Sequence, residues 1–292
     1  MNSNISHTSD ISLSNAAWRL LRPKQWIKNF FVFAPLIFAS QFLNETAVYA
    51  SLGAFILFSV AASATYVLND IKDIENDRLH PKKSKERPLA AGWISPPQAW
   101  GLWAVLVTIT LSGFIWLPDV MLIIIGYLLL NIAYSIYLKH QPVLDIFTIA
   151  TGFVLRVYAG ATAISVPVSS WMFVTTFSLA LFLAAIKRQQ ELINLGDQAR
   201  SVLKVYSVAT VERFAEMSAT GALVFYSFFV MSARPELVIT VPFVLFGLFR
   251  YFYISEQLNI GESPTEALIN DKQLLITVVG WVGTSLWALW PA

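Results

Sequence analysis

Long apolar runs separated by sparse charges are the feature of this 292-residue sequence that most constrains its fold. Several runs reach about twenty residues, the length that an α-helix needs to cross the roughly 30 Å hydrocarbon core of a bilayer. Only 13% of the residues are charged, about half the share that is usual in soluble domains. The pattern excludes a soluble globular enzyme, a disordered chain and a fibrous protein. We therefore expect an all-α, polytopic integral membrane protein.

The apolar runs predict nine transmembrane helices. The expected spans are residues 28–43, 48–68, 98–117, 119–138, 142–163, 170–187, 213–232, 236–254 and 272–290. Breaks such as Leu117-Pro118-Asp119 are typical of short connections between antiparallel helices. Residues 1–17 are polar, and we expect a disordered cytoplasmic tail before a single membrane domain over residues 18–292. The stretch from about Leu13 to Arg22 also has the apolar spacing of a short interfacial helix.

The basic residues predict a cytoplasmic N-terminus. With the N-terminus inside, eighteen of the twenty Lys and Arg residues fall on the cytoplasmic side, and only Arg156 and Arg234 lie elsewhere. Two long connections, residues 69–97 and 188–212, also fall on that side. We expect them to be loops that cap the cytoplasmic face.

An acidic stretch, Asn69-Asp70-Ile71-Lys72-Asp73-Ile74-Glu75-Asn76-Asp77-Arg78, directly follows the second apolar run. If the helix continues, Asn69, Asp73 and Asp77 recur every four residues on one face, with Asp70 on its flank. Like charges at this spacing disfavour an isolated helix but become favourable around a cation, and oxygen ligands suit Mg²⁺. Asn69, Asp70, Asp73 and Asp77 are therefore the candidate Mg²⁺ ligands.

Basic side chains follow the acidic stretch, from Arg78 through Lys83 to Arg87. A metal ion and basic side chains together can share the charge of a diphosphate. The plainer interpretation of such a charge-dense segment is a solvated helix end at the membrane surface.

The spacing Asn69-Asp70-x-x-Asp73-x-x-x-Asp77 resembles the first aspartate-rich motif of the UbiA-type prenyltransferase superfamily. Two further segments resemble it: Leu21-Arg22-Pro23-Lys24-Gln25-Trp26-Ile27-Lys28-Asn29 and Arg87-Pro88-Leu89-Ala90-Ala91-Gly92. The resemblance covers nearly all of the chain. It implies nine helices around a central cavity that faces the cytoplasm, Mg²⁺ as the cofactor, and Asp70, Asp73 and Asp77 as catalytic residues.

One branch of this superfamily, the decaprenyl-phosphate phosphoribosyltransferases, resembles the chain more closely. The similar segments are Lys24-Gln25-Trp26-Ile27-Lys28-Asn29, Asp77-Arg78-x-His80-Pro81-x-Lys83, Leu138-Lys139-His140, Val143-Leu144-Asp145, Lys187-Arg188-x-x-Glu191-Leu192 and the Phe249-Arg250-Tyr251 region. This resemblance implies phosphoribosyl diphosphate as donor, a polyprenyl phosphate as acceptor, and a bacterial-type inner (plasma) membrane with the active site on its cytoplasmic side. The substrate-binding residues that it implies are Lys24, Lys28, Asn29, Arg78, Lys83, Lys139, Asp145, Lys187, Arg188 and Glu191.

The chain departs from the superfamily at its second aspartate motif, Asp-x-x-x-Asp, which helps to hold an isoprenyl diphosphate through a second Mg²⁺. The corresponding stretch has one acid, Glu191, preceded by Lys187 and Arg188, and Asp197 follows six residues later. A second metal pair is therefore not expected. A cationic pair oriented by Glu191 suits a phosphate monoester, whereas the simpler interpretation is a surface ion pair.

Ionisable residues within the spans are further candidates, because such residues usually face the interior of the bundle. Asp145 and Arg156 lie eleven residues apart, which places them within about 20° of one direction on a helix. We expect Asp145 at the mouth of the cavity. For Arg156 a substrate contact and a structural pair remain equally open, and Tyr66 and Tyr134 are candidates for contact with ribose or phosphate.

The function that we expect is Mg²⁺-dependent transfer of 5-phosphoribosyl to a polyprenyl phosphate. The nearest alternative is a UbiA-type enzyme that moves an isoprenyl chain to an aromatic acceptor, and a lipid or solute transporter is the alternative from another class. Short external connections argue against transport, because alternating access needs polar residues on both routes. The basic residues are accounted for by topology and one cavity mouth, so nucleic acid is not an expected partner. Association into oligomers is compatible with this architecture.

Overall fold

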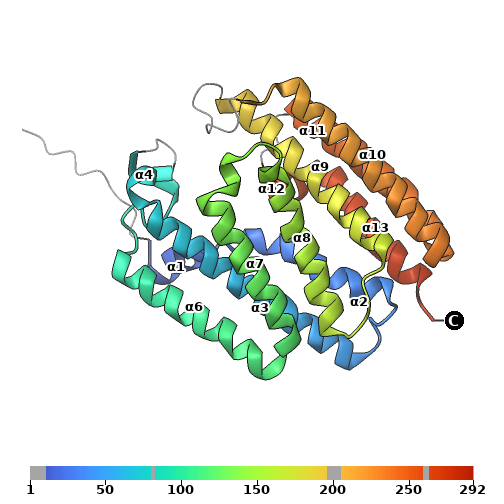
Figure 1. Cartoon of the computed structure of the whole chain (residues 1–292), viewed down its shortest axis with the longest axis horizontal. Coiled ribbons are helices and arrows are strands. Elements are labelled where there is room, and N and C mark those ends of the chain that lie inside the picture. Colours follow the sequence, from blue (N-terminus) through green and yellow to red (C-terminus); the bar gives the residue numbers. More distant parts are fainter. Residues whose placement is uncertain (1–10, 80–82, 196–204, 259–262, 292) are drawn as a thin grey trace, which may run out of the picture. The chain divides into compact units, whose positions relative to one another are not determined.

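A computed structural model describes most of the chain (Figure 1), namely residues 11–79, 83–195, 205–258 and 263–291. Every regular element in these ranges is a helix, which confirms the all-α fold class. We expected one domain, but the chain separates into two compact units. Unit 1 comprises Met1–Trp26 and Leu57–Gly113, and unit 2 comprises Ile27–Ile56 and Phe114–Ala292.

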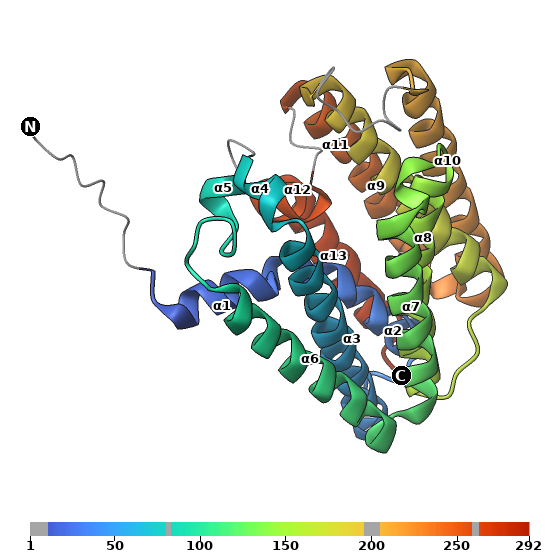
Figure 2. The ribbon, with the colours of Figure 1, turned by 60° about the vertical axis from the view of Figure 1, so that its left-hand side comes forward.

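Unit 1 contains α1, the beginning of η1, the second half of α3, α4, α5 and most of α6 (Figure 2). The bounds of these elements are α1 Leu13–Leu21, η1 Pro23–Phe33, α3 Glu45–Lys72, α4 Ile74–Leu79, α5 Lys83–Glu86 and α6 Pro96–Trp116. The side chain of Ser12 caps α1 by accepting a hydrogen bond from the backbone N–H of Asn15 (3.4 Å). Because Ser is a favourable N-cap, α1 begins at Leu13, in agreement with the short helix expected from about Leu13 to Arg22, and residues 13–17 belong to this helix.

The core of unit 1 joins α1, α3, α6 and the segment after α5. Its buried side chains are Ala16, Leu20, Ala64, Val67, Leu89, Ile94, Ala99 and Leu106. Ser63 of α3 donates a hydrogen bond to the carbonyl oxygen of Leu21 (2.8 Å) and accepts one from the indole N–H of Trp26 (3.0 Å). These two bonds attach the segment that carries Arg22 to α3.

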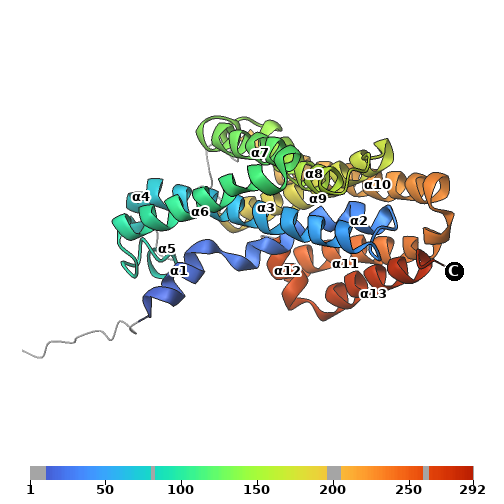
Figure 3. The ribbon, with the colours of Figure 1, turned by 90° about the horizontal axis from the view of Figure 1, so that it is seen from below.

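Unit 2 contains the remainder of η1 and the first half of α3, together with the elements from α2 to α13. The bounds of those not yet given are α2 Ala34–Phe38, α7 Pro118–Ile136, η2 Leu138–His140, α8 Leu144–Ala163, α9 Ser170–Leu195, α10 Val208–Ala233, η5 Pro235–Thr240, α11 Val241–Leu258, α12 Pro264–Asn270 and α13 Lys272–Ala288. In Figure 1, α9 lies between α8 and α10, and Figure 3 shows α11 and α13 side by side. A core cluster that includes Phe182, Ile186 and Ile254 packs α9 against α10 and α11.

The 3₁₀-helix η1 packs closely against α8. Three residues of a 3₁₀-helix rise about 6 Å, as do four residues of an α-helix. Asn29 and Val32 can therefore meet Arg156 and Gly160 in register. The Asn29 side chain accepts a hydrogen bond from Arg156 Nε (2.8 Å), and a Cβ at Gly160 would lie 1.8 Å from the carbonyl oxygen of Val32. Only glycine fits at position 160.

Seven helices in the described residues are long and apolar enough to cross a membrane, as expected for a multi-pass membrane protein. They are Glu45–Lys72, Pro96–Trp116, Pro118–Ile136, Leu144–Ala163, Ser170–Asn194, Val208–Ala233 and Pro235–Gln257. The first expected span, residues 28–43, forms part of η1 and the five-residue α2, and the last forms the 17-residue α13. The total of nine spans stays a prediction.

The two connections that we expected to be loops are partly helical. Residues 69–97 include the end of α3 together with α4 and α5, and α9 continues to Leu195. In α9 the Lys187–Glu191 and Arg188–Glu191 ion pairs, at i,i+4 and i,i+3, favour continuation of the helix. Residues 188–195 are therefore helical rather than a loop, and residues 196–204 lie outside the described residues.

Candidate active site

The acidic stretch follows an almost continuous helical path. α3 ends at Lys72 and α4 begins at Ile74, but the N–H of Asp73 still donates to the carbonyl of Asn69 and the N–H of Asp77 to that of Asp73, both at 2.9 Å. Residues seven apart lie on one side of such a path. This arrangement buries Asp70 and Asp77, whereas Asn69 and Asp73 are half-buried. The expected face of Asn69, Asp73 and Asp77 is thus replaced by an Asp70–Asp77 pair.

Three cations surround this pair, and we call Arg22, Asp70, Asp77, Lys83 and Arg87 the acidic cluster. Arg87 Nη1 donates to Asp70 Oδ1 at 3.1 Å and also to Asp77 Oδ2. Arg22 Nη2 donates to Asp70 Oδ1 at 2.6 Å, and Lys83 Nζ lies 3.7 Å from Asp77 Oδ1. The cluster joins α1, α3, α4 and α5, all within unit 1.

Arg22 and Arg87 were not among the predicted site residues, although both occur in the segments that carry the family resemblance. Each directly follows a short helix and directly precedes a proline, and a residue before proline is biased away from helical geometry. An Arg-Pro pair that ends a helix was therefore the available signal. Tyr66, which was predicted, packs its ring under Arg22 at 5.2 Å.

Two other predicted residues of unit 1 do not join the cluster. Lys24 is exposed, and Arg78 forms an exposed ion pair with Glu75 (3.1 Å). Such a pair contributes little to stability. His80 and Pro81, which belong to the segment that resembles the phosphoribosyltransferase branch, lie outside the described residues.

The acidic cluster retains oxygen atoms that could bind a metal ion. Asp70 Oδ2 is buried and has no hydrogen-bond partner, and the Asp73 carboxylate makes no ion pair with any residue that the structure describes. No group of three or more His, Cys, Asp or Glu side chains in the described ranges forms a cage for a metal ion by itself. These residues fit a hard cation that draws its other ligands from phosphate or water, which is the usual binding mode of Mg²⁺.

A second charged group lies in unit 2 around Arg188, and we call Tyr134, Asp145, Arg188, Glu191 and Tyr206 the arginine cluster. Arg188 donates from Nε to Asp145 (2.7 Å), from Nη1 to Glu191 (2.5 Å) and from Nη2 to the Tyr134 hydroxyl (2.7 Å). Its side chain is only 1% exposed. All three nitrogens of the guanidinium group bind protein groups and the side chain is buried, so Arg188 has little access to a phosphate.

Tyr206 completes the arginine cluster and was not predicted. Its hydroxyl donates to Asp145 Oδ1 (3.0 Å) and accepts from the backbone N–H of Val143, a residue with φ of 69°. Burial raises the pKa of Tyr206 to about 12, so it stays protonated at neutral pH. Asp145, which we expected at a cavity mouth, is fully buried because Arg188 and Tyr206 bind it from two sides.

The other candidates in unit 2 are dispersed. Arg156 binds Asn29, donates to the carbonyl of Gly152 (2.7 Å) and lies over the ring of Tyr127 (5.0 Å). Lys28 and Lys139 are half-buried, and Lys187 lies 3.9 Å from Glu191 with 37% of its side chain exposed. Asp197, the second acid of the altered motif, lies outside the described residues.

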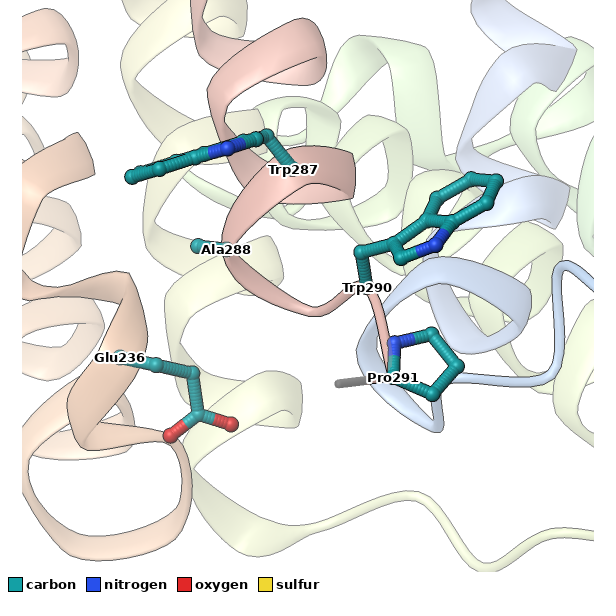
Figure 4. A pocket seen from close by; sticks show the side chains of 5 residues that line it. All are labelled: Glu236, Trp287, Ala288, Trp290 and Pro291. Atoms are coloured by element: carbon teal, nitrogen blue, oxygen red, sulfur yellow. The ribbon is translucent and has the colours of Figure 1, made fainter.

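A cleft of about 450 Å³ opens at the C-terminal end of α13 and shares no lining residue with either cluster (Figure 4). Its lining consists of Glu236, Trp287, Ala288, Trp290 and Pro291. The lining includes an acid and no basic side chain. A phosphate-bearing substrate therefore does not fit this cleft.

Comparison with known proteins identifies relatives over most of the chain. The profile of the UbiA prenyltransferase family matches residues 29–267. A decaprenyl-phosphate phosphoribosyltransferase of Mycolicibacterium smegmatis is 32% identical and aligns over 91% of this chain and 90% of its own length. One of Corynebacterium glutamicum is 33% identical over 93% of this chain and 86% of its own. A UbiA homolog from Archaeoglobus fulgidus, solved with GPP and Mg²⁺, has the same fold, with a TM-score of 0.68 and 21% identity. The alignment covers 94% of this chain and 99% of the homolog.

Proposed function

This chain belongs to the UbiA prenyltransferase family, and we propose that it transfers a 5-phosphoribosyl group from phosphoribosyl diphosphate to a polyprenyl phosphate. The two relatives named above support the choice of substrates, because they are about one third identical to this chain over most of its length. The observation that carries the proposal is the acidic cluster. Its paired carboxylates and three basic side chains have the charges that a metal-bound diphosphate requires.

The reaction exchanges one C–O bond for another. The bond between ribose C1 and the diphosphate breaks, and a phosphate oxygen of the lipid forms the new bond to C1. That oxygen is already anionic at neutral pH, so the protein does not need a general base. Its residues instead orient the two substrates and neutralise charge.

The acidic cluster supplies the groups for this task. Asp70, Asp73 and Asp77, together with Asn69, would hold Mg²⁺, which neutralises the developing charge on the diphosphate. Arg22, Lys83 and Arg87 would bind diphosphate oxygens, and guanidinium groups suit such oxygens because they donate in a fixed fork. In unit 2, Lys187 has the greater access to a phosphate, since Arg188 is buried.

We also propose nine membrane spans, a cytoplasmic N-terminus and an inner (plasma) membrane location with the active site on the cytoplasmic side. At rises of about 2.0 and 1.5 Å per residue, η1 from Lys28 onward and α2 together extend about 20 Å, so the first crossing would also include residues 39–43. The 17 residues of α13 extend about 26 Å. The distribution of Lys and Arg supports the orientation.

A donor comparison tests the proposal. The purified protein is incubated with Mg²⁺ and decaprenyl phosphate, and with either ribose-labelled phosphoribosyl diphosphate or labelled geranyl diphosphate. We expect ribose label in the lipid fraction, and none when Mg²⁺ is chelated or Asp77 is replaced by Asn. If ribose label never enters the lipid, the proposal is wrong. In a third incubation, which contains labelled geranyl diphosphate and an aromatic acceptor, transfer of the geranyl label would instead identify an isoprenyl transferase.

A further inference from the structure

The carboxylates of the acidic cluster already have cationic partners. Arg87 bridges Asp70 and Asp77 through one nitrogen, Arg22 holds Asp70, and Lys83 lies beside Asp77. Both carboxylates are almost completely buried. A metal ion can therefore ligate Asp70 Oδ1 or Asp77 Oδ2 only by displacing a guanidinium group.

Neither a metal ion nor a diphosphate alone satisfies the cluster. A divalent cation that took both carboxylates would leave the side chains of Arg22 and Arg87, which are 30% and 25% exposed, without counter-charges. A diphosphate that took the arginines would leave Asp70 buried without a cation and Asp77 buried with Lys83 alone, both beside another anion. A buried charge that loses its partner is strongly unfavourable. The two ligands together provide a new partner for every group.

Two oxygen-bearing groups give this exchange a starting point. Asp70 Oδ2 is buried within the cluster and has no hydrogen-bond partner among the described residues, and Asp73 lies half-buried one turn further along the helical path. A cation can contact these groups while the Arg87 bridge is still in place. The bridge then opens as the diphosphate oxygens reach the guanidinium groups.

We propose that Arg87, assisted by Arg22, is a positioning residue that stands in for the metal ion and makes binding of metal and diphosphate mutually dependent. This inference rests on the proposed function, since it concerns the diphosphate site of that reaction. Its consequence is that a divalent cation binds weakly alone and tightly with diphosphate. The arginines exchange a carboxylate partner for a phosphate partner in the same step.

Binding of Mn²⁺ to the purified full-length protein, followed by electron paramagnetic resonance, tests this coupling without turnover. The titration is repeated with inorganic diphosphate, and a protein-free sample corrects for Mn²⁺–diphosphate complexes in solution. We expect diphosphate to tighten Mn²⁺ binding roughly tenfold or more, within the range of known coupled sites. Equal affinity with and without diphosphate would overturn the proposal.

Variants identify the residue responsible. Arg87→Gln removes the competing cation, so Mn²⁺ alone should bind roughly tenfold more tightly and the effect of diphosphate should shrink by a similar factor. Arg87→Lys, which keeps the charge, should restore much of the coupling. Lys85→Gln is the matched control, because Lys85 is exposed on α5 and carries the same charge outside the cluster. Should Arg87→Gln fail to fold, Arg22→Gln tests the same exchange at Asp70, and unchanged Mn²⁺ affinity in the variant that folds refutes it.

The choice of ligand separates this inference from the proposed function. Coupling with inorganic diphosphate but none with phosphoribosyl diphosphate would refute the proposed donor and leave the arginine exchange intact. Label transfer from phosphoribosyl diphosphate without coupling of Mn²⁺ and diphosphate would refute the exchange alone.

Discussion

The acidic cluster of unit 1 and the arginine cluster of unit 2 are built from the same groups, since in each an arginine bridges two carboxylates. Arg188 is 1% exposed and all three of its nitrogens bind protein groups. Arg87 is 25% exposed, and the Asp70 that it binds keeps one buried oxygen for which the described part of the chain offers no hydrogen-bond partner. Similar composition thus produces a closed cluster in unit 2 and an exchangeable one in unit 1.

The difference shows why an arginine bound to a carboxylate does not by itself indicate a binding site. A buried pair is costly to separate, because a charge left alone is poorly solvated. A pair near solvent contributes little and separates easily. Burial and unsatisfied atoms, rather than residue type, therefore distinguish the site from the structural support.

The largest expected effect compares the two bridging arginines. Arg188→Met should lower the free energy of unfolding by about 3–5 kcal/mol, because Asp145 and Glu191 would remain buried without their cation. Arg87→Met should cost less, about 1–3 kcal/mol, because Arg22 and Lys83 still bind the two buried carboxylates. Denaturant unfolding in detergent measures both. Equal losses would remove the distinction between the clusters. The triple variant Asp145→Asn, Arg188→Met, Glu191→Gln should regain most of the stability.

Asp73→Asn separates catalysis from stability in unit 1. The Asp73 carboxylate makes no ion pair within the described ranges, so its loss should leave the melting temperature unchanged. As a proposed metal ligand it should lower kcat by on the order of 100-fold. Initial rates of ribose transfer and thermal unfolding are measured on the same sample. The exposed Asp119 at the start of α7 is the control, and Asp119→Asn should keep full activity. A fall in stability that matches the fall in rate would show that Asp73 is structural.

Gly160→Ala tests the close packing in unit 2. The added methyl group overlaps the carbonyl oxygen of Val32, and overpacking of this kind costs about 1–3 kcal/mol. Gly126→Ala on α7 is the matched control, since a Cβ there meets nothing within 4 Å. Alanine also favours a helix. A melting temperature of the Gly160 variant equal to that of the control would mean that η1 can move away from α8.

The smallest expected effect is a pH dependence at the surface of unit 2. A hydrogen bond from Arg250 lowers the pKa of Asp271 below its ordinary value of 3.8. The folded state therefore favours the ionised carboxylate. Its contribution is fully present above pH 3.8 and is lost as the pH falls through the folded-state pKa. Asp271→Asn should lower the melting temperature slightly at pH 6 and leave it unchanged near pH 2. If the Asn variant still melts at a lower temperature near pH 2, the effect comes from the role of Asp271 as the N-cap of α13 rather than from its charge.

The helices of both units were largely predictable because uninterrupted apolar runs have few alternatives in a membrane. Glu45–Lys72 and Leu144–Ala163, for example, each contain an expected span. The exception is η1. The apolar residues of this segment do not recur at a spacing that would predict a 3₁₀-helix or its change to the α-helix α2. The residue-level signal there was limited to Pro23 and Pro35.

The site was predictable only where its parts are near in sequence. Asp70 and Asp77 were named as candidates because they lie on one helical path. Which of the carboxylates are buried depends on Arg87, which follows α5 in the sequence and binds both of them. Asp145 and Arg188, 43 residues apart, pair between α8 and α9. Their spacing carries no information about that contact, so the sequence did not predict that protein groups bind Arg188.

The register between η1 and α8 has a consequence for how this chain can vary. One added or deleted residue before Asn29 would rotate the rest of the 3₁₀-helix by about 120° and shift it by about 2 Å. Asn29 would then miss Arg156, and a side chain would meet Gly160. Over evolutionary time, the length of this segment should therefore be more strictly preserved than the identity of most of its residues.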